Sequence, residues 1–220
     1  MALPRFKRLP RHIAVIPDGN RRWAQARGLP KAAGYAAGIQ PGLDLCDLCL
    51  ELGIAEMTAY GFTADNTKRP VVQRLAFQAA CVDGVRRLAD RDVALLVVGN
   101  RDSPMFPPEL APYTTREPLG RSLMRANMLV NYDWQWDLGQ ALTNGHAGKR
   151  DLLSAIGSAD VSRVDLVIRW GGRRRLSGLL PIQTVYADFC VLDDLWPDFT
   201  PHQFFQALRW YEQQEITLGG

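Results

Sequence analysis

Short apolar runs, separated by stretches with helical spacing, constrain the fold of this chain most strongly. The apolar runs fall at residues 12–16, 54–62, 93–99, 126–132, 164–170 and 189–192. Helical spacing is seen at residues 36–52, 71–90, about 151–157 and 201–216. Strands that are apolar throughout are typical of parallel sheets with both faces covered by helices. The pattern therefore predicts an α/β fold, with a mainly parallel central sheet surrounded by helices.

The length and composition are those of one globular domain. The chain has 220 residues, of which 47% are hydrophobic, enough for a single sizeable core. We find no internal repeat and no clear linker, so residues 1–220 are expected to form one domain. The proline-rich stretch at 102–118 is interpreted as an irregular connection.

Charge and cysteine content argue against several protein classes. A formal net charge of +3 is too small to indicate a nucleic-acid or anionic-membrane partner. No apolar run is long enough for a signal peptide or a stable membrane insertion, so a soluble, cytoplasmic protein is expected. Cys46 and Cys49 form a CxxC within a helical pattern, where packing is a better interpretation than zinc binding.

The first motif that suggests chemistry is IPDGNRRWA, at residues 16–24. Asp18 follows a buried strand, and Asp18 and Asn20 are good residues to cap a helix that would start there. Gly19 lets the backbone approach a ligand, and a helix N-terminus binds phosphate. Arg21 and Arg22 could hold a diphosphate in bidentate fashion. The alternative is an ordinary capped helix, which an isolated Asp-Gly would favour.

Three further motifs also lie next to apolar runs. YGFTADNTKRP (60–70) carries Asp65, Asn66 and Arg69 in a polar loop, which alone could be a capped turn. VIRWGGRRRLSG (167–178) places three adjacent arginines beside two glycines, which favours an anion site over a solvated basic loop. VYADF (185–189) puts Asp188 beside an apolar run, where a carboxylate is either a cap or a metal ligand.

Together these motifs resemble the cis-prenyltransferases, the family of undecaprenyl diphosphate synthase. HIAVIPDGNRRWA matches the opening family signature His-Ile-Ala-x-Ile-Met-Asp-Gly-Asn-x-Arg-Trp-Ala. FTADNTKRP partly matches Phe-Ser-x-Glu-Asn-Trp-x-Arg-Pro, and IRWGGRRRLS corresponds to Ile-Arg-Thr-x-Gly-x-x-Arg-Leu-Ser. YADF with LWPDF corresponds to the last signature, so four motifs occur in the family order between His12 and about Tyr211.

The resemblance implies a homodimeric, Mg²⁺-dependent enzyme that acts on isoprenyl diphosphates and has a hydrophobic tunnel beside its sheet. Asp18 would hold Mg²⁺ on an allylic diphosphate. Asn66 stands where the family places the residue tied to proton loss, so Asp18 and Asn66 are the implied catalytic residues. Asp188 takes the position of a glutamate that contacts the metal from the facing subunit or from the edge of the site.

The resemblance also implies a set of substrate-binding residues. These are Gly19, Asn20, Arg21, Arg22, Trp23, Lys31, Tyr35, Thr63, Asp65, Thr67, Arg69, Arg169, Arg175 and Ser177. Gly19 to Arg22 and Lys31 would bind the allylic diphosphate. Arg169, Arg175 and Ser177 would bind the second diphosphate. Positive charge suits this chemistry, because the leaving diphosphate must be neutralised.

Several positions depart from the family pattern. Tyr35 replaces a histidine, Thr67 replaces a tryptophan and Arg173 replaces a glutamate. Trp134, Trp136 and Trp170 stand where the family has small residues. Aromatic faces stabilise cations, although each tryptophan taken singly could pack in the core, which is the preferred interpretation for Trp134.

These departures resemble the branch that makes lavandulyl and cyclolavandulyl diphosphates. The implied reaction joins two dimethylallyl diphosphates head to middle, giving a branched C10 diphosphate that is either open or cyclised. A regular short-chain cis-prenyltransferase that uses isopentenyl diphosphate is the second hypothesis. The third is a non-catalytic subunit of a heteromeric enzyme, against which the retained Asp18, Arg69, Arg175 and Ser177 argue.

Overall fold

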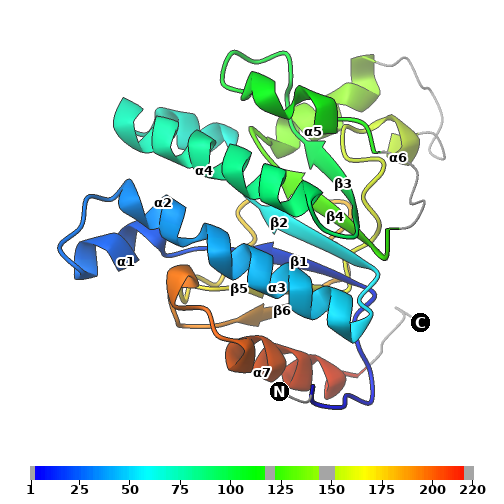
Figure 1. Ribbon diagram of the computed structural model, residues 1–220. Helices are drawn as coiled ribbons and strands as arrows, with labels where there is room; N and C mark the ends of the chain where they lie inside the picture. The colour runs from blue at the N-terminus through cyan, green and yellow to red at the C-terminus, as the bar shows by residue number, and fades with distance from the viewer. Residues whose placement is uncertain (1–2, 117–121, 144–151, 216–220) are drawn as a thin grey trace.

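Six parallel strands form one sheet in the computed structural model, which describes residues 3–116, 122–143 and 152–215 (Figure 1). The strands are β1 (His12–Ile16), β2 (Glu56–Tyr60), β3 (Val93–Val98), β4 (Met124–Leu129), β5 (Leu166–Arg169) and β6 (Asp188–Val191). Their order across the sheet is β3-β4-β2-β1-β5-β6, and every pairing is parallel. The predicted fold class is confirmed, with each strand at or within two residues of a predicted apolar run.

The central strand β1 is buried on both faces, which explains its continuous apolar sequence. Ile13 and Val15 belong to the core on the side of α3 and α7, whereas Ala14 and Ile16 belong to the core on the other side. A strand covered on both faces has no position for a solvated side chain.

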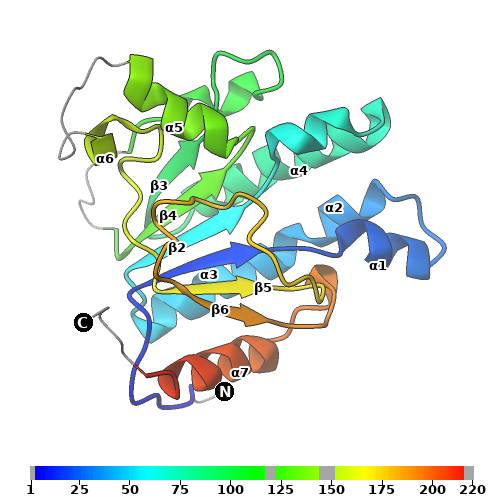
Figure 2. The same cartoon turned by 180° about the vertical axis from the view of Figure 1, so that it is seen from behind.

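Helices cover the two faces unequally. They are α1 (Asn20–Ala26), α2 (Ala33–Ala37), α3 (Ile39–Leu52), α4 (Val71–Ala89), α5 (Trp134–Thr143), α6 (Leu152–Ala155) and α7 (Pro201–Glu212), with 3₁₀ turns at Ala64–Lys68, Pro108–Tyr113 and Trp196–Asp198. Figure 1 shows α3, α4 and α7 over one face. Figure 2 shows the opposite face, where the segment between β5 and β6 crosses the strands below α5 and α6.

Some elements differ from the sequence-based expectation. The helix predicted at 36–52 is divided into α2 and α3. Helix α5 was not predicted, and its first residues were considered only for Trp134 and Trp136, which replace small residues of the family. The expected irregular stretch contains the 3₁₀ turn at Pro108–Tyr113. Positions 117–118, 151 and 216 of the predicted elements lie outside the described residues.

For two of the substituted tryptophans, the structure decides between a core position and a place in the site. Trp170 is fully buried on the α7 side of the sheet, edge-on to Trp196 with 4.9 Å between ring centroids. Its Nε1–H donates to Gln203 Oε1 at 3.2 Å. Trp134 is 45% exposed, so the expected core packing is wrong for this residue. Neither tryptophan lines the charged cleft described below.

The two cysteines of the CxxC lie where the sequence-based interpretation placed them. Cys46 and Cys49 are free and buried in α3, as helix packing requires. Within the described part of the chain, we find no helix with the length and apolar character needed to cross a membrane.

Candidate active site

A cleft of about 530 Å³ opens beyond the carboxyl ends of β2, β1 and β5, which are neighbours in the sheet. The chain leaves β1 for β2 on one side and later adds β5 on the other. Such a switch point leaves a crevice in an open α/β sheet. Three of the four sequence motifs follow these strands, and they therefore meet in the cleft.

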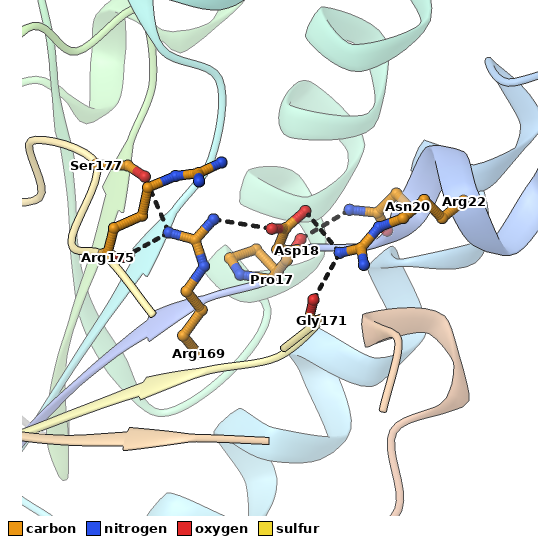
Figure 3. Close-up of polar contacts among 8 residues, drawn as sticks. All are labelled: Pro17, Asp18, Asn20, Arg22, Arg169, Gly171, Arg175 and Ser177. Carbon is orange, nitrogen blue, oxygen red and sulfur yellow. Dashed lines mark hydrogen bonds and ion pairs between the residues drawn. The ribbon is translucent and has the colours of Figure 1, made fainter. Parts of the chain in front are cut away.

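Asp18 lies two residues after β1 and is held by two arginines (Figure 3). Arg169 Nη2–H donates to Asp18 Oδ2 at 2.8 Å. Arg22 Nη2 lies 3.5 Å from Asp18 Oδ1 and donates to the Gly171 carbonyl at 2.8 Å. The Asp18 side chain is 31% exposed, whereas that of Arg169 is 5% exposed. The ion pair thus joins a buried cation to a carboxylate that faces the cleft.

These contacts keep the Asp18 carboxyl ionised. Burial alone would raise its pKa, but the hydrogen bond and charge of Arg169, the charge of Arg22 and the Gly19 N–H together hold the pKa below its usual value. An ionised carboxylate can bind a cation at neutral pH.

The Arg169 guanidinium is fixed by the loop that follows β5. Its Nη1 donates to Ser177 Oγ at 2.9 Å and to the Arg175 carbonyl oxygen. Tyr60, at the end of β2, donates its hydroxyl to the Ser177 carbonyl at 2.8 Å. The arginine-rich segment is therefore folded back over the cleft.

The start of α1 depends on Gly19, not on the caps predicted from the sequence. Gly19 is the N-cap, with a φ of +109°, and no side chain caps the helix. A Cβ on Gly19 would lie 2.8 Å from Leu195. Asn20 donates to the Pro17 carbonyl at 2.8 Å. The Asp18 carboxylate accepts from Arg169 and does not cap the helix.

The second side of the cleft is formed by the segment after β2 and by α4. Arg69 Nη1 donates to the Tyr35 hydroxyl at 2.8 Å, and the Tyr35 ring stacks on Phe77 with 4.5 Å between centroids. Asn66 Oδ1 accepts the Thr63 N–H at 3.1 Å. The Asn66 carboxamide is thus engaged in holding its own turn.

The charges in the cleft favour an anion with several negative charges. Six arginines and two aspartates line it: Arg21, Arg22, Arg69, Arg169, Arg173, Arg175, Asp18 and Asp65. Arginine suits phosphate groups because its planar fork can donate two parallel hydrogen bonds.

A second, apolar chamber of about 80 Å³ adjoins the charged cleft. Pro17, Asn20, Tyr35, Gly61 and Phe77 line both spaces. The apolar chamber extends between α3, α4 and the sheet, where Leu45, Met57 and Trp196 are among its lining residues. The site thus combines a charged entrance with a small apolar interior.

The structure brings most of the predicted site residues together. Those that line the cleft are Asp18, Gly19, Asn20, Arg21, Arg22, Tyr35, Thr63, Asp65, Asn66, Arg69, Arg169, Arg175 and Ser177. Tyr60 and Phe77 also line it but were not predicted. No family motif marked Phe77, and only its place on the inner face of α4 identifies it.

Three predicted substrate contacts do not line the cleft. Trp23 Nε1–H donates to Asp198 Oδ1 at 2.7 Å, which turns the indole away. Lys31 is exposed in the connection between α1 and α2. The Thr67 hydroxyl donates to the Ala64 carbonyl within the 3₁₀ turn.

Asp188, the second predicted metal ligand, lies far from Asp18 within one chain. It begins β6 and pairs with Leu166, which begins β5. Asp18 follows the opposite end of the parallel strand β1. The two carboxylates therefore lie beyond opposite ends of the parallel strands, which excludes a shared metal within one chain. Among the described residues, no group of three or more His, Cys, Asp or Glu side chains could hold a metal ion.

The chain is similar in sequence to known prenyltransferases. Residues 16–219 match the prenyltransferase family model described as undecaprenyl diphosphate synthase. A ditrans,polycis-undecaprenyl-diphosphate synthase from Pseudomonas aeruginosa is 32% identical, with 96% of this chain and 91% of the relative covered. An isoprenyl transferase from Nitrosomonas europaea is 31% identical, with 99% and 88% covered. The family assignment thus extends over nearly the whole chain.

A solved structure shares the fold at lower sequence identity. Lavandulyl diphosphate synthase from Lavandula x intermedia, in complex with dimethylallyl diphosphate, aligns with a TM-score of 0.83 and 21% identity. The alignment covers 96% of this chain and 98% of that structure.

Gly171 offers a test of the contact between the loops after β1 and β5. Its φ is +88°, and a Cβ would lie 2.5 Å from Arg22 Nη2 and 3.1 Å from the Asp18 backbone. We expect Gly171→Ala to lower kcat/KM for prenyl transfer at least about tenfold, a loss of roughly 1.4 kcal/mol of transition-state stabilisation. Steady-state kinetics would measure this loss.

Gly28→Ala is the matched control. Gly28 also has a positive φ, +68°, but nothing lies within 4 Å of its Cβ position. Both variants carry the same kind of backbone strain, of about 1–2 kcal/mol. Equal loss of activity in the two variants would contradict the proposed importance of the Gly171 contact.

Proposed function

Because the chain belongs to the cis-prenyltransferase family of undecaprenyl diphosphate synthase, we propose that it is a short-chain enzyme joining two dimethylallyl diphosphates head to middle. The product would be a branched C10 diphosphate, open or cyclised. The enzyme class rests on the family, whereas the choice of substrates rests on the departures from its motifs and on the site.

The observation that carries the proposal is the size of the apolar chamber. Its volume is about 80 Å³. An apolar cavity of about 150 Å³ is known to hold benzene, which has one carbon more than a dimethylallyl group. The chamber has about half that volume, so a five-carbon tail would also lie against the adjoining wall of the cleft, and the chamber itself leaves little room for a growing polyprenyl chain.

The first half of the reaction needs an ionising diphosphate next to Asp18. Mg²⁺ in phosphate-binding sites is usually held by one or two carboxylates, the substrate phosphates and several waters, so Asp18 fits as a residue that would hold it. When bound, Mg²⁺ would neutralise charge on the departing diphosphate. Arg21, Arg22 and the start of α1 would bind the same diphosphate.

The second half needs an acceptor whose diphosphate lies beside Arg169, Arg175 and Ser177, with Arg173 adding positive charge. The double bond of the acceptor would attack C1 of the allylic cation, forming one C–C bond and leaving a tertiary cation. Loss of a proton from a neighbouring carbon would then form a double bond. Asn66 is a poor base and already accepts a hydrogen bond, so we assign the proton to the released diphosphate.

Regular chain elongation with isopentenyl diphosphate is the second candidate. It is favoured by the names of the curated relatives, among them a trans,polycis-polyprenyl diphosphate synthase from Thermobifida fusca that is 32% identical to this chain. In that reaction the acceptor would bind to the same arginines, and the small chamber would still limit the product to a short chain.

A product assay separates the two candidates. Purified protein incubated with Mg²⁺ and dimethylallyl diphosphate alone should give a C10 diphosphate, identified by gas chromatography and mass spectrometry after removal of phosphate. Addition of isopentenyl diphosphate should not be required. Product that forms only when isopentenyl diphosphate is present would replace the first candidate with the second.

The role of the chamber can be tested at Phe77. Phe77→Ala removes the ring that stacks on Tyr35, so the wall between the cleft and the chamber would open. We expect this variant to accept a C10 allylic diphosphate at least about tenfold better than the parent, relative to dimethylallyl diphosphate. Phe205→Ala, on α7 and outside both spaces, is the control. Unchanged substrate preference in Phe77→Ala would argue against the chamber as the size limit.

We also propose that the enzyme is a homodimer. Several exposed apolar side chains lie on α5 and on the segment before β6, including Leu142, Val185 and Tyr186. Asp188 follows this segment directly, so a facing copy is the only means by which it could approach a second cleft. Sedimentation velocity should give the mass of a dimer at micromolar concentration, and Tyr186→Glu should shift it toward the monomer. A fully active monomer would refute this assembly.

A further inference from the structure

The ion pair between Asp18 and Arg169 joins two residues that the proposed function assigns to different diphosphates. Arg169 Nη2 lies 2.8 Å from Asp18 Oδ2, and the two residues follow different strands, β1 and β5. Asp18 would hold the metal on the allylic diphosphate, whereas Arg169 would bind the acceptor diphosphate. In the observed arrangement, Asp18 occupies the guanidinium that would bind the acceptor diphosphate. Arg169 in turn occupies the carboxylate that would bind the metal.

We propose that Arg169 is a positioning residue that couples the two diphosphate positions. A diphosphate that binds the Arg169 guanidinium displaces Asp18, and the freed carboxylate then becomes available to the metal of the other substrate. This inference rests on the proposed function, because it needs two diphosphates in one cleft. It predicts that occupation of the acceptor position promotes occupation of the metal position.

The direction of the exchange follows from charge and geometry. A diphosphate carries more negative charge and more acceptor oxygens than one carboxylate, and it matches the arginine fork. Arg169 can remain in place during the exchange, because its Nη1 is held by Ser177 and the Arg175 carbonyl. Its Nε–H has no hydrogen-bond partner among the described residues, so Asp18 does not use the full donor capacity of the guanidinium.

Asp18 is the more exposed and less tightly held member of the pair. Its side chain is 31% exposed and lines the cleft, whereas that of Arg169 is 5% exposed. Its other carboxylate contact, at 3.5 Å from a half-exposed Arg22, is longer than the Arg169 bond. Loss of the Arg169 bond would therefore leave an ionised carboxylate facing the substrates.

The test measures binding of inorganic diphosphate by calorimetry in the presence of a metal chelator. Without metal, Asp18 acts only as a competitor for Arg169. We expect Asp18→Asn to tighten diphosphate binding about tenfold, as loss of a charged competitor from a buried arginine allows. In the Arg169→Gln background, the same Asp18→Asn change should alter the affinity less than about twofold. A gain in affinity is not the result that structural damage would produce.

Asp65→Asn is the matched control for general charge repulsion. Asp65 lines the same cleft, but its carboxylate pairs with Lys68 at 2.7 Å and not with Arg169. We expect Asp65→Asn to change log Kd for diphosphate by less than half as much as Asp18→Asn changes it. Arg169→Met replaces Arg169→Gln in the cycle if the glutamine variant fails to fold, since it keeps a long aliphatic side chain and removes the cation for which Asp18 competes.

Two results would overturn the proposal. One is an unchanged diphosphate affinity in Asp18→Asn, and the other is a gain of equal size in the Arg169→Gln background or in Asp65→Asn. The binding cycle needs neither turnover nor a particular prenyl group. A positive cycle together with a failed dimethylallyl assay would therefore keep the coupling and reject only the proposed substrates.

Discussion

The ion pair between Asp18 and Arg169 connects the ends of two neighbouring strands and gives the cleft its shape. The parallel register places Arg169 beside Ile16, two residues before Asp18, so the pairing of β1 with β5 brings the two side chains within reach. Because Arg169 is buried, its charge depends on this contact for neutralisation. A guanidinium that is only 5% exposed needs an anion or several acceptors, and Asp18, Ser177 and the Arg175 carbonyl supply them.

The same arrangement explains why one site can combine charge with an apolar interior. Residues that extend beyond the strands form the charged cleft, while the space between α3, α4 and the sheet forms the chamber. Tyr35 and Phe77 stand between the two, with Tyr35 tied to Arg69 through its hydroxyl. A substrate with a diphosphate head and an apolar tail matches both halves.

Much of the fold and of the site could be predicted from the sequence because both depend on local patterns. The two-sided burial of β1 appears as a continuous apolar run, and the motif arginines follow the strands that place them. The caps at Asp18 and Asn20 were wrong, because the carboxylate of Asp18 is used by a residue 151 positions away. Trp134 was misjudged because burial depends on distant packing that local spacing does not reveal.

The sequence by itself determined the fold class, the family motifs and the strand ends that carry them, since these follow from local apolar periodicity and residue type. Only the tertiary structure decided which of those residues meet. It placed Asp188 at the opposite end of the parallel strands from Asp18. It directed the Trp170 side chain into the core beside α7 and brought Phe77 against Tyr35. It also paired Asp18 with Arg169. Such contacts depend on strand order, register and the direction of each side chain, which residues distant in sequence fix together.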